Sequence, residues 1–202
     1  MINTIIFDFG DVFVNLDKEA ATAEFGKLGL TKPNDDLHRL NFEFEIGKIS
    51  ELEFLEGFQK HLPKADIVAI RKAWNAVIGE FPLYRLEFLQ LLSEKYRLFL
   101  LTNTDAIHID RFEHNVGMTF SRDFYQCFEK VYYSYELGMR KPDKAIFEYI
   151  INQHDLSPKR TLFVDDKKEN TDAAASLGLR VWNLKPGVED VIDLFDKKIL
   201  DV

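Results

Sequence analysis

The feature that most constrains the fold is an alternation of short apolar segments with segments of helical periodicity. The apolar segments are rich in β-branched and aromatic residues and end at polar or turn residues, which predicts strands at 4–8, 97–103, 130–134, 161–166 and 180–184. Helical patterns fill the intervals at 83–95, 105–117, 143–154 and 171–179. Such alternation is typical of a mostly parallel sheet covered by helices on both faces, so we predict a doubly wound (Rossmann-like) α/β fold.

Residues 15–82 interrupt this alternation with amphipathic helical stretches and no convincing strand. Ser50 and Glu53 form a capping box for the third stretch, and Gly47 is placed to end the second. Because the insertion leaves after the first strand and returns before the second, we expect a helical cap above the strand ends. Residues 1–14 and 83–202 would then form the α/β core, which carries the active site.

Composition and charge exclude several classes of protein. The net charge is −8 without a cluster of basic residues, so nucleic acid is not an expected partner. No segment approaches the roughly 18 apolar residues of a membrane span, and the N-terminus lacks the pattern of a signal peptide. The single Cys127 cannot form an internal disulfide. We therefore expect a cytoplasmic protein without a membrane partner, either a monomer or a small homo-oligomer.

Polar side chains converge at the ends of the predicted strands. Asp8 ends the first strand, Thr102 and Asn103 end the second, and Asp165 and Asp166 end the fourth. In this architecture ligands bind at the carboxyl ends of the strands. Several carboxylates with a hydroxyl, and no Cys or His among them, suit a hard cation and point to Mg²⁺ rather than zinc.

Lys141 supplies positive charge near this predicted site. It lies in GMRKP, where Gly138 and Pro142 punctuate the chain just before a helix. A lysine beside a metal can neutralise phosphate oxygens, and the amides of the turn after Thr102 can bind the same group. Taken singly, each of these residues also has a simpler interpretation, as a turn former, a helix cap or a surface charge.

Taken together and in this order, the motifs resemble those of the haloacid dehalogenase superfamily. FDFGDV resembles its first motif, LTNT the second, the lysine of LGMRKP the third and FVDDKKEN the fourth, from residue 4 to about 185. Residues 15–82 look like its helical cap. GKIS, KAWNAV, LTNT followed by His108, YELGMRKP and FVDDKKEN are most similar to the bacterial α-D-glucose-1-phosphate phosphatases, and LGMRKP with FVDD also resembles the phosphatase domain of soluble epoxide hydrolases.

The resemblance implies a magnesium-dependent phosphatase acting on a small phosphorylated metabolite, with a sugar phosphate such as glucose 1-phosphate favoured. Asp8 would be the nucleophile of a two-step transfer through an aspartyl-phosphate. Mg²⁺ would be held by Asp8, the Gly10 carbonyl and Asp166, with Asp165 as a ligand or a neighbouring acceptor. The remaining implied roles are phosphate binding by Thr102, the Asn103 amide and Lys141, and support of the loop by Asn170.

The sequence departs from the superfamily pattern at Gly10. Most of these phosphatases carry an aspartate there that protonates the leaving group and then activates water, although the glucose-1-phosphate phosphatases also look to have Gly. Two substitutes are conceivable. Asp11 is adjacent but is expected to point away, since successive residues of extended chain face opposite sides. His108 could reach the site from the first turn of its helix, yet a lone helical His is more often structural.

In the cap, Trp74 of KAWNAV resembles a residue of the compared phosphatases and is a candidate substrate contact. An equally good interpretation is a buried cap aromatic, and the same two interpretations hold for Phe44 and Glu45. Three rival functions remain open: a haloacid dehalogenase, a phosphotransferase or sugar-phosphate mutase, and a non-catalytic binding module of the same fold. The pair Asp165 and Asp166 argues against the dehalogenase, because two negative charges beside the nucleophile hinder a carboxylate substrate unless a cation is present.

Overall fold

The predicted strands form one five-stranded sheet in a computed structural model, which describes residues 1–200. The strand order is β3-β2-β1-β4-β5, and all neighbours run parallel. The strands are β1 (Thr4–Phe7), β2 (Arg97–Thr102), β3 (Lys130–Tyr133), β4 (Thr161–Asp165) and β5 (Arg180–Asn183). The predicted fold class is confirmed. Each strand ends one residue before its predicted end, because that residue already belongs to the following loop or helix.

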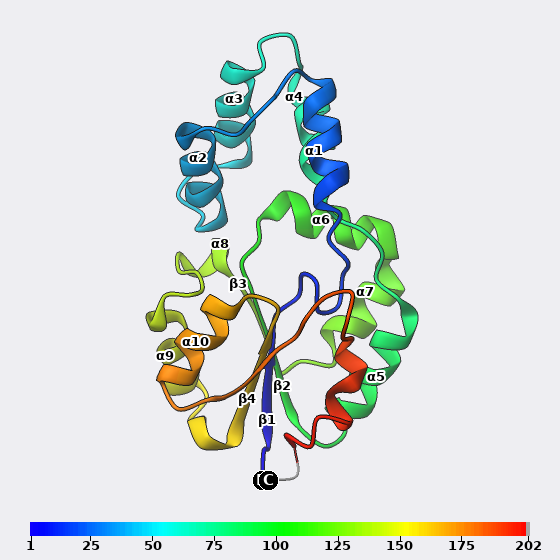
Figure 1. Cartoon of the computed structure of the whole chain (residues 1–202), viewed down its shortest axis with the longest axis vertical. Coiled ribbons are helices and arrows are strands. Elements are labelled where there is room, and N and C mark those ends of the chain that lie inside the picture. The colour runs from blue at the N-terminus through cyan, green and yellow to red at the C-terminus, as the bar shows by residue number, and fades with distance from the viewer. Residues whose placement is uncertain (201–202) are drawn as a thin grey trace.

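Helices cover both faces of the sheet (Figure 1). Successive strand residues face opposite sides, so Ile5 and Phe7 lie in one hydrophobic cluster and Ile6 in another. The first cluster is completed by α5 (Leu83–Ser93), α6 (Ala106–Val116), α7 (Met118–Tyr125) and the 3₁₀ helix η2 (Val191–Phe195). The second cluster is completed by α9 (Lys144–Gln153) and α10 (Lys168–Ser176). The apolar strands are therefore buried on both faces, as parallel sheets require.

Some elements of the core are absent from the sequence prediction. Helix α7 begins directly after Gly117, which has φ 79° and offers no side-chain cap, so the usual start signal is missing. The helix α8 (Ser134–Leu137) and the 3₁₀ helix η1 (Pro158–Arg160) are too short to show a helical period. Within residues 1–200, no helix combines the length and the apolar composition needed to cross a membrane.

The helices of the insertion lie beyond the carboxyl ends of the strands (Figure 1). They are α1 (Lys18–Lys27), α2 (Asp35–Glu45), α3 (Glu51–His61) and α4 (Ile67–Asn75). Their buried side chains form a cluster of their own, to which α6 adds Ile107. The predicted capping box of Ser50 and Glu53 is present. We call residues 15–82 the cap; its status as a separate domain stays a prediction.

The two chain segments that join the cap to the core run side by side. Asn15 donates to the Glu80 carbonyl at 2.8 Å, and Gly79 donates to the Asn15 carbonyl at 2.9 Å. A Cβ on Gly79 would lie 2.7 Å from that carbonyl, so glycine permits the close approach. This pairing fixes the cap's entry and exit beside the end of β1.

Candidate active site

The ends of β1 and β4 bring three carboxylates together. Asp8 follows β1 and Asp165 ends β4, and these strands are neighbours with Phe7 paired to Val164. The Asp8 N–H donates to the Val164 carbonyl at 2.9 Å, which extends the pairing to the aspartate itself. Oxygens of Asp8, Asp165 and Asp166 lie within 4.8 Å of one another. The three carboxylates, which the sequence predicted at the ends of neighbouring strands, are thus close enough to share one cation.

Lys141 is buried among these carboxylates, with 1% of its surface exposed. Its ammonium lies 2.8 Å from Asp8 Oδ1 and 2.7 Å from Asp165 Oδ2, and it donates to the Leu101 carbonyl at 2.8 Å. Burial alone would lower the pKa of Lys141, but the two carboxylates outweigh it and the pKa is raised. Because its three protons have three acceptors, Lys141 holds a fixed positive charge against Asp8.

Asp165 and Asp166 are adjacent in sequence but differ in their surroundings. Asp165 is fully buried and accepts hydrogen bonds from Lys141, from the Lys167 N–H at 2.7 Å and from the Asn170 amide at 3.0 and 2.9 Å. Asp166 is half-buried and lines the cavity at the strand ends. Asp165 therefore holds Lys141 and the loop in place, whereas Asp166 presents its carboxylate to the cavity.

The site carries more negative charge than one lysine balances. Burial raises the pKa of Asp8 to about 7, against the opposing effect of Lys141. Burial also raises the pKa of Asp166, and the nearby Asp165 and Asp11 carboxylates add to this effect. A divalent cation beside these groups would favour their ionised forms. Since the available donors are carboxylate oxygens, the site fits Mg²⁺, as predicted.

The expected phosphate-binding residues close the other side of the same cavity, whose volume is about 160 Å³. Thr102 ends β2, is buried, and lines the cavity together with Asn103 and Lys141. The Asn103 side chain donates to the Lys141 carbonyl at 2.8 Å and accepts from the Lys141 N–H at 2.9 Å. The Asn103 side chain thus holds the Lys141 loop, and the binding of phosphate by the Asn103 backbone amide stays a prediction.

Gly10 and Asp11 also line this cavity. A Cβ on Gly10 would come within 2.8 Å of Leu16 Cδ1. Asp11 has φ 58°, and its carboxylate accepts from the Leu16 N–H and from Lys18 Nζ, both at 3.0 Å. The expectation that Asp11 points away from the site is wrong, because its left-handed backbone interrupts the alternation of an extended chain.

His108 lines the cavity as well, but both of its ring nitrogens are engaged. Nδ1 lies 3.0 Å from Asp105 Oδ2, and Nε2 lies 3.0 Å from the Trp74 carbonyl oxygen. Both partners accept hydrogen bonds, so this arrangement favours the doubly protonated ring. Burial alone would lower the pKa of His108, but Asp105 and these hydrogen bonds outweigh it and raise the pKa. Neither ring nitrogen of His108 is therefore free to act as an acid or a base.

The candidate residues of the cap fall into two groups. Trp74 and Glu45 line a second cavity, of about 350 Å³, and Glu45 lines the first cavity too. Phe44 is buried and stacks on Phe54 with ring centroids 4.4 Å apart, and it belongs to neither cavity wall. Phe44 is therefore a packing residue of the cap.

Two residues at the site were not predicted from the sequence. Asp105 is 1% exposed and accepts from Trp74 Nε1 at 3.0 Å as well as from His108. Its position directly after LTNT, as the N-cap of α6, is the signal that would have drawn attention to it. Lys18 lines both cavities and pairs with Asp11, but a lysine at the start of an amphipathic helix carries no such signal.

Comparison with known proteins places the chain in a family. A family model described as haloacid dehalogenase-like hydrolase matches residues 2–178. A D-ribitol-5-phosphate phosphatase from Bacteroides thetaiotaomicron is 30% identical over 195 residues, covering 94% of this chain and 95% of the relative. A sesquiterpene phosphatase from Aspergillus oryzae is 29% identical over 154 residues, covering 75% of this chain and 76% of that protein.

A solved structure agrees with these relatives. A HAD family enzyme from Bacteroides thetaiotaomicron, in complex with magnesium and inorganic phosphate, superposes with a TM-score of 0.87 and 34% identity, covering 96% of this chain and all of the other. The relatives are phosphatases but are not named as glucose-1-phosphate phosphatases, so the finer resemblance is not confirmed. The resemblance to the superfamily is confirmed, and this chain belongs to the haloacid dehalogenase-like hydrolases.

Proposed function

We propose that the protein is a magnesium-dependent phosphatase that hydrolyses a small phosphate monoester through an aspartyl-phosphate on Asp8. The observation that carries this proposal is the buried contact of Asp8 with Lys141, at the edge of a cluster of carboxylates. The similarity to two phosphatases, and to an enzyme crystallised with magnesium and phosphate, supports it.

In the first step an Asp8 oxygen forms a bond to phosphorus while the bond from phosphorus to the leaving oxygen breaks. The leaving oxygen takes up a proton. In the second step the oxygen of a water molecule forms a bond to the same phosphorus while the bond from phosphorus to Asp8 breaks, and the water gives up a proton to a base; this releases phosphate and restores the Asp8 carboxylate. Lys141 holds Asp8 in position and offsets the charge that builds up on the phosphoryl group. The Thr102 hydroxyl and the Asn103 backbone N–H would bind phosphate oxygens, since both residues line the cavity beside Asp8.

Asp8, Asp166 and the Gly10 carbonyl would hold the Mg²⁺ ion, with Asp165 behind them. The ion supplies positive charge that lets an anionic carboxylate approach an anionic phosphate. Asp165 accepts hydrogen bonds from Lys141, Lys167 and Asn170, so it fixes the loop that carries Asp166 and holds Lys141 beside Asp8.

Asp11 is the better candidate for the acid or base that the position of Gly10 lacks. Asp11 lines the cavity, and its carboxylate is held there by hydrogen bonds from the Leu16 N–H and Lys18 Nζ. A carboxylate in this position would accept a proton from the attacking water. His108 is less suited, because both of its protons are already donated to acceptors.

The substrate is a small phosphorylated metabolite. The sequence resemblance favours a sugar phosphate such as glucose 1-phosphate, whose anomeric oxygen is a leaving group that needs little protonation. The two relatives are named for phosphates of a polyol and of a sesquiterpene, so their names alone favour neither kind of leaving group. The walls of the cap cavity are the features that should decide between them.

The test is turnover of acetyl phosphate, p-nitrophenyl phosphate and glucose 1-phosphate, each with Mg²⁺ and with EDTA. Wild-type protein should release phosphate only with Mg²⁺, and Asp8→Asn should abolish the release. Asp172→Asn, at an exposed aspartate of α10, is the matched control and should keep full turnover. No Asp8-dependent turnover of any of these three compounds would overturn the proposal and favour a phosphotransferase or a binding protein.

A further inference from the structure

The larger cavity lies inside the cap and adjoins the site at Asp8. Its volume is about 350 Å³, at the lower end of the range for pockets that bury small organic ligands. It shares four wall residues with the smaller cavity: Lys18, Glu45, Val77 and His108. In phosphoryl transfer the leaving group departs opposite the attacking oxygen. A leaving group displaced by Asp8 would therefore point away from the sheet, into this cavity.

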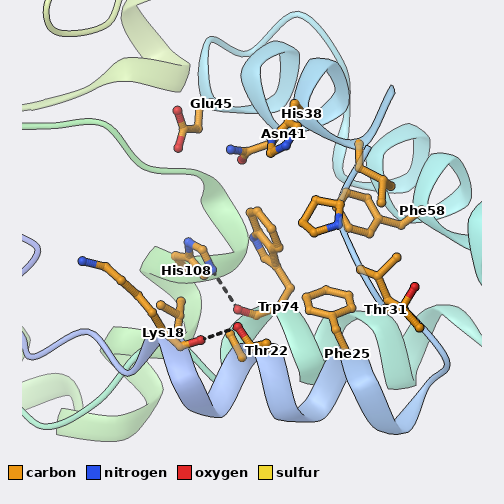
Figure 2. A pocket seen from close by; sticks show the side chains of 15 residues that line it. Lys18, Thr22, Phe25, Thr31, His38, Asn41, Glu45, Phe58, Trp74 and His108 are labelled. Carbon is orange, nitrogen blue, oxygen red and sulfur yellow. Dashed lines mark hydrogen bonds between the residues drawn. The ribbon is translucent and has the colours of Figure 1, made fainter. Parts of the chain in front are cut away.

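The walls of the cavity are mostly hydrocarbon. Figure 2 shows the rings of Phe25, Phe58 and Trp74 pointing into it, with a polar side formed along α2. Leu30, Pro33 and Leu37 complete the apolar part. These side chains come from α1, α2, α3, α4 and the loop between α1 and α2, so the apolar surface contacts a bound group from several directions.

The aromatic walls are held in place before any ligand binds. The Phe25 and Phe58 ring centroids lie 5.6 Å apart, and that of Trp74 lies 5.7 Å from Phe58. Trp74 is also fixed by its hydrogen bond to Asp105 and by a stack on His108, with 5.0 Å between centroids and 8° between planes. The cavity is thus preformed, and binding costs little reorganisation.

Four polar side chains of the wall already have partners, and Thr31, His38 and Asn41 line it as well. Lys18 pairs with Asp11, the Thr22 hydroxyl donates to the Lys18 carbonyl at 2.8 Å, and both His108 nitrogens are engaged. Glu45 lies 3.0 Å from Arg140. Asn41 Oδ1, buried on the α2 side, has no partner among residues 1–200. Because His38 and Asn41 lie together on the α2 side, hydroxyls spread around a polyol would partly lie against the rings without hydrogen bonds, which is unfavourable (Figure 2). An apolar group gains from the same surface.

We infer that the phosphate ester taken by this site has a largely apolar leaving group, a cyclic or branched hydrocarbon with at most one or two polar substituents, and that the cap cavity selects it over a sugar. This inference rests on the proposed phosphatase function and narrows it. The phosphate is bound at Asp8, the hydrocarbon contacts Phe25, Phe58 and Trp74, and a single hydroxyl or amino group can reach Asn41.

The test compares two primary phosphates on six-membered rings, cyclohexylmethyl phosphate and glucose 6-phosphate, with acetyl phosphate as a substrate too small to fill the cap cavity. We expect kcat/KM for cyclohexylmethyl phosphate to exceed that for glucose 6-phosphate at least tenfold. Leu30→Gln places an amide in the apolar wall and should lower the ratio of cyclohexylmethyl to acetyl phosphate turnover at least fivefold. Leu52→Gln, at a leucine 54% exposed on α3, is the matched control and should keep the wild-type ratio.

The outcomes separate this inference from the proposed function. Asp8-dependent turnover of acetyl phosphate together with a preference for glucose 6-phosphate, or with an unchanged ratio in Leu30→Gln, would overturn the apolar leaving group and leave the phosphatase standing. Absence of Asp8-dependent turnover of all three compounds would overturn the phosphatase itself, and the inference with it.

Discussion

Lys141 occupies a place where removal of its charge leaves two buried carboxylates without a counter-ion. Replacement by Met keeps the length of the side chain but leaves Asp8 and Asp165 unpaired. Breaking a buried ion pair in this way costs about 3–5 kcal/mol of the free energy of unfolding. Urea denaturation in EDTA should show such a loss for Lys141→Met. Lys168→Met, at a lysine whose side chain is 76% exposed, should change stability by less than about 0.5 kcal/mol. Equal losses in the two variants would contradict the argument.

Asp11 can be tested through the second half of the reaction. If its carboxylate accepts the proton of the attacking water, Asp11→Asn should slow release of phosphate from Asp8 by about 10²–10⁴-fold. The phosphorylated protein should then accumulate and be detectable by acid quench of a single turnover. Lys18→Met removes the partner of Asp11 but keeps its carboxylate, and should have a smaller effect. Turnover of Asp11→Asn at the wild-type rate without accumulation would exclude the role.

Single residues also show what the sequence could not reveal. The grouping of Asp8, Asp165 and Asp166 was predictable, because parallel strands end at one edge of the sheet. The separate surroundings of Asp165 and Asp166 were not, since they depend on where Lys141 and Asn170 place their donors. The direction of Asp11 was not predictable either, because a left-handed φ in a non-glycine residue leaves no clear trace in the sequence.

At the scale of elements, the cap helix α4 is joined to the core helix α6 by Trp74 and His108. His108 stacks on the Trp74 ring, its Nε2 donates to the Trp74 carbonyl, and Asp105 accepts from both side chains. The pKa of His108 is raised in the folded state, so its proton stabilises the fold fully below the ordinary His pKa of about 6.5. That contribution is lost as the pH rises through the higher, folded-state pKa.

This linkage predicts a pH-dependent difference between two proteins. The melting temperature of wild-type protein should exceed that of His108→Asn by more at pH 6 than at pH 9. Groups such as His154, whose pKa is lowered by burial and by Arg97, act in the opposite sense but are common to both proteins, so they cancel in the difference. A difference that stays constant across this range would show that His108 is not charged in the folded protein.

Among the elements, the strands were predicted almost residue by residue and the helices less evenly. The strands of the sheet are continuous apolar runs between turns, which makes their position visible in the sequence. Helix α7 lacks a side-chain cap, and α10 begins at Lys168, three residues before its predicted start and without a side-chain cap. The cavity of the cap could not be predicted from the sequence, because several elements distant in sequence contribute to its wall.

For the whole molecule, the charge balance of the site predicts that Mg²⁺ stabilises the folded protein. An ion that binds only the folded state adds about 2.7 kcal/mol at a concentration of 100 times its Kd. For a chain of 202 residues this corresponds to a rise in melting temperature of roughly 5–10 °C. Wild-type protein titrated with MgCl₂ in a thermal unfolding assay should show this rise, and EDTA should reverse it.

Asp166→Asn should abolish most of the rise, because Asp166 presents its carboxylate to the cavity. Asp172→Asn, at an exposed aspartate, should keep it, which separates loss of an ion ligand from a general loss of charge. An equal rise in melting temperature with Mg²⁺ in Asp166→Asn and wild-type protein would mean that the ion binds elsewhere. The attack of the Asp8 carboxylate on an anionic phosphate would then need a source of positive charge other than this ion.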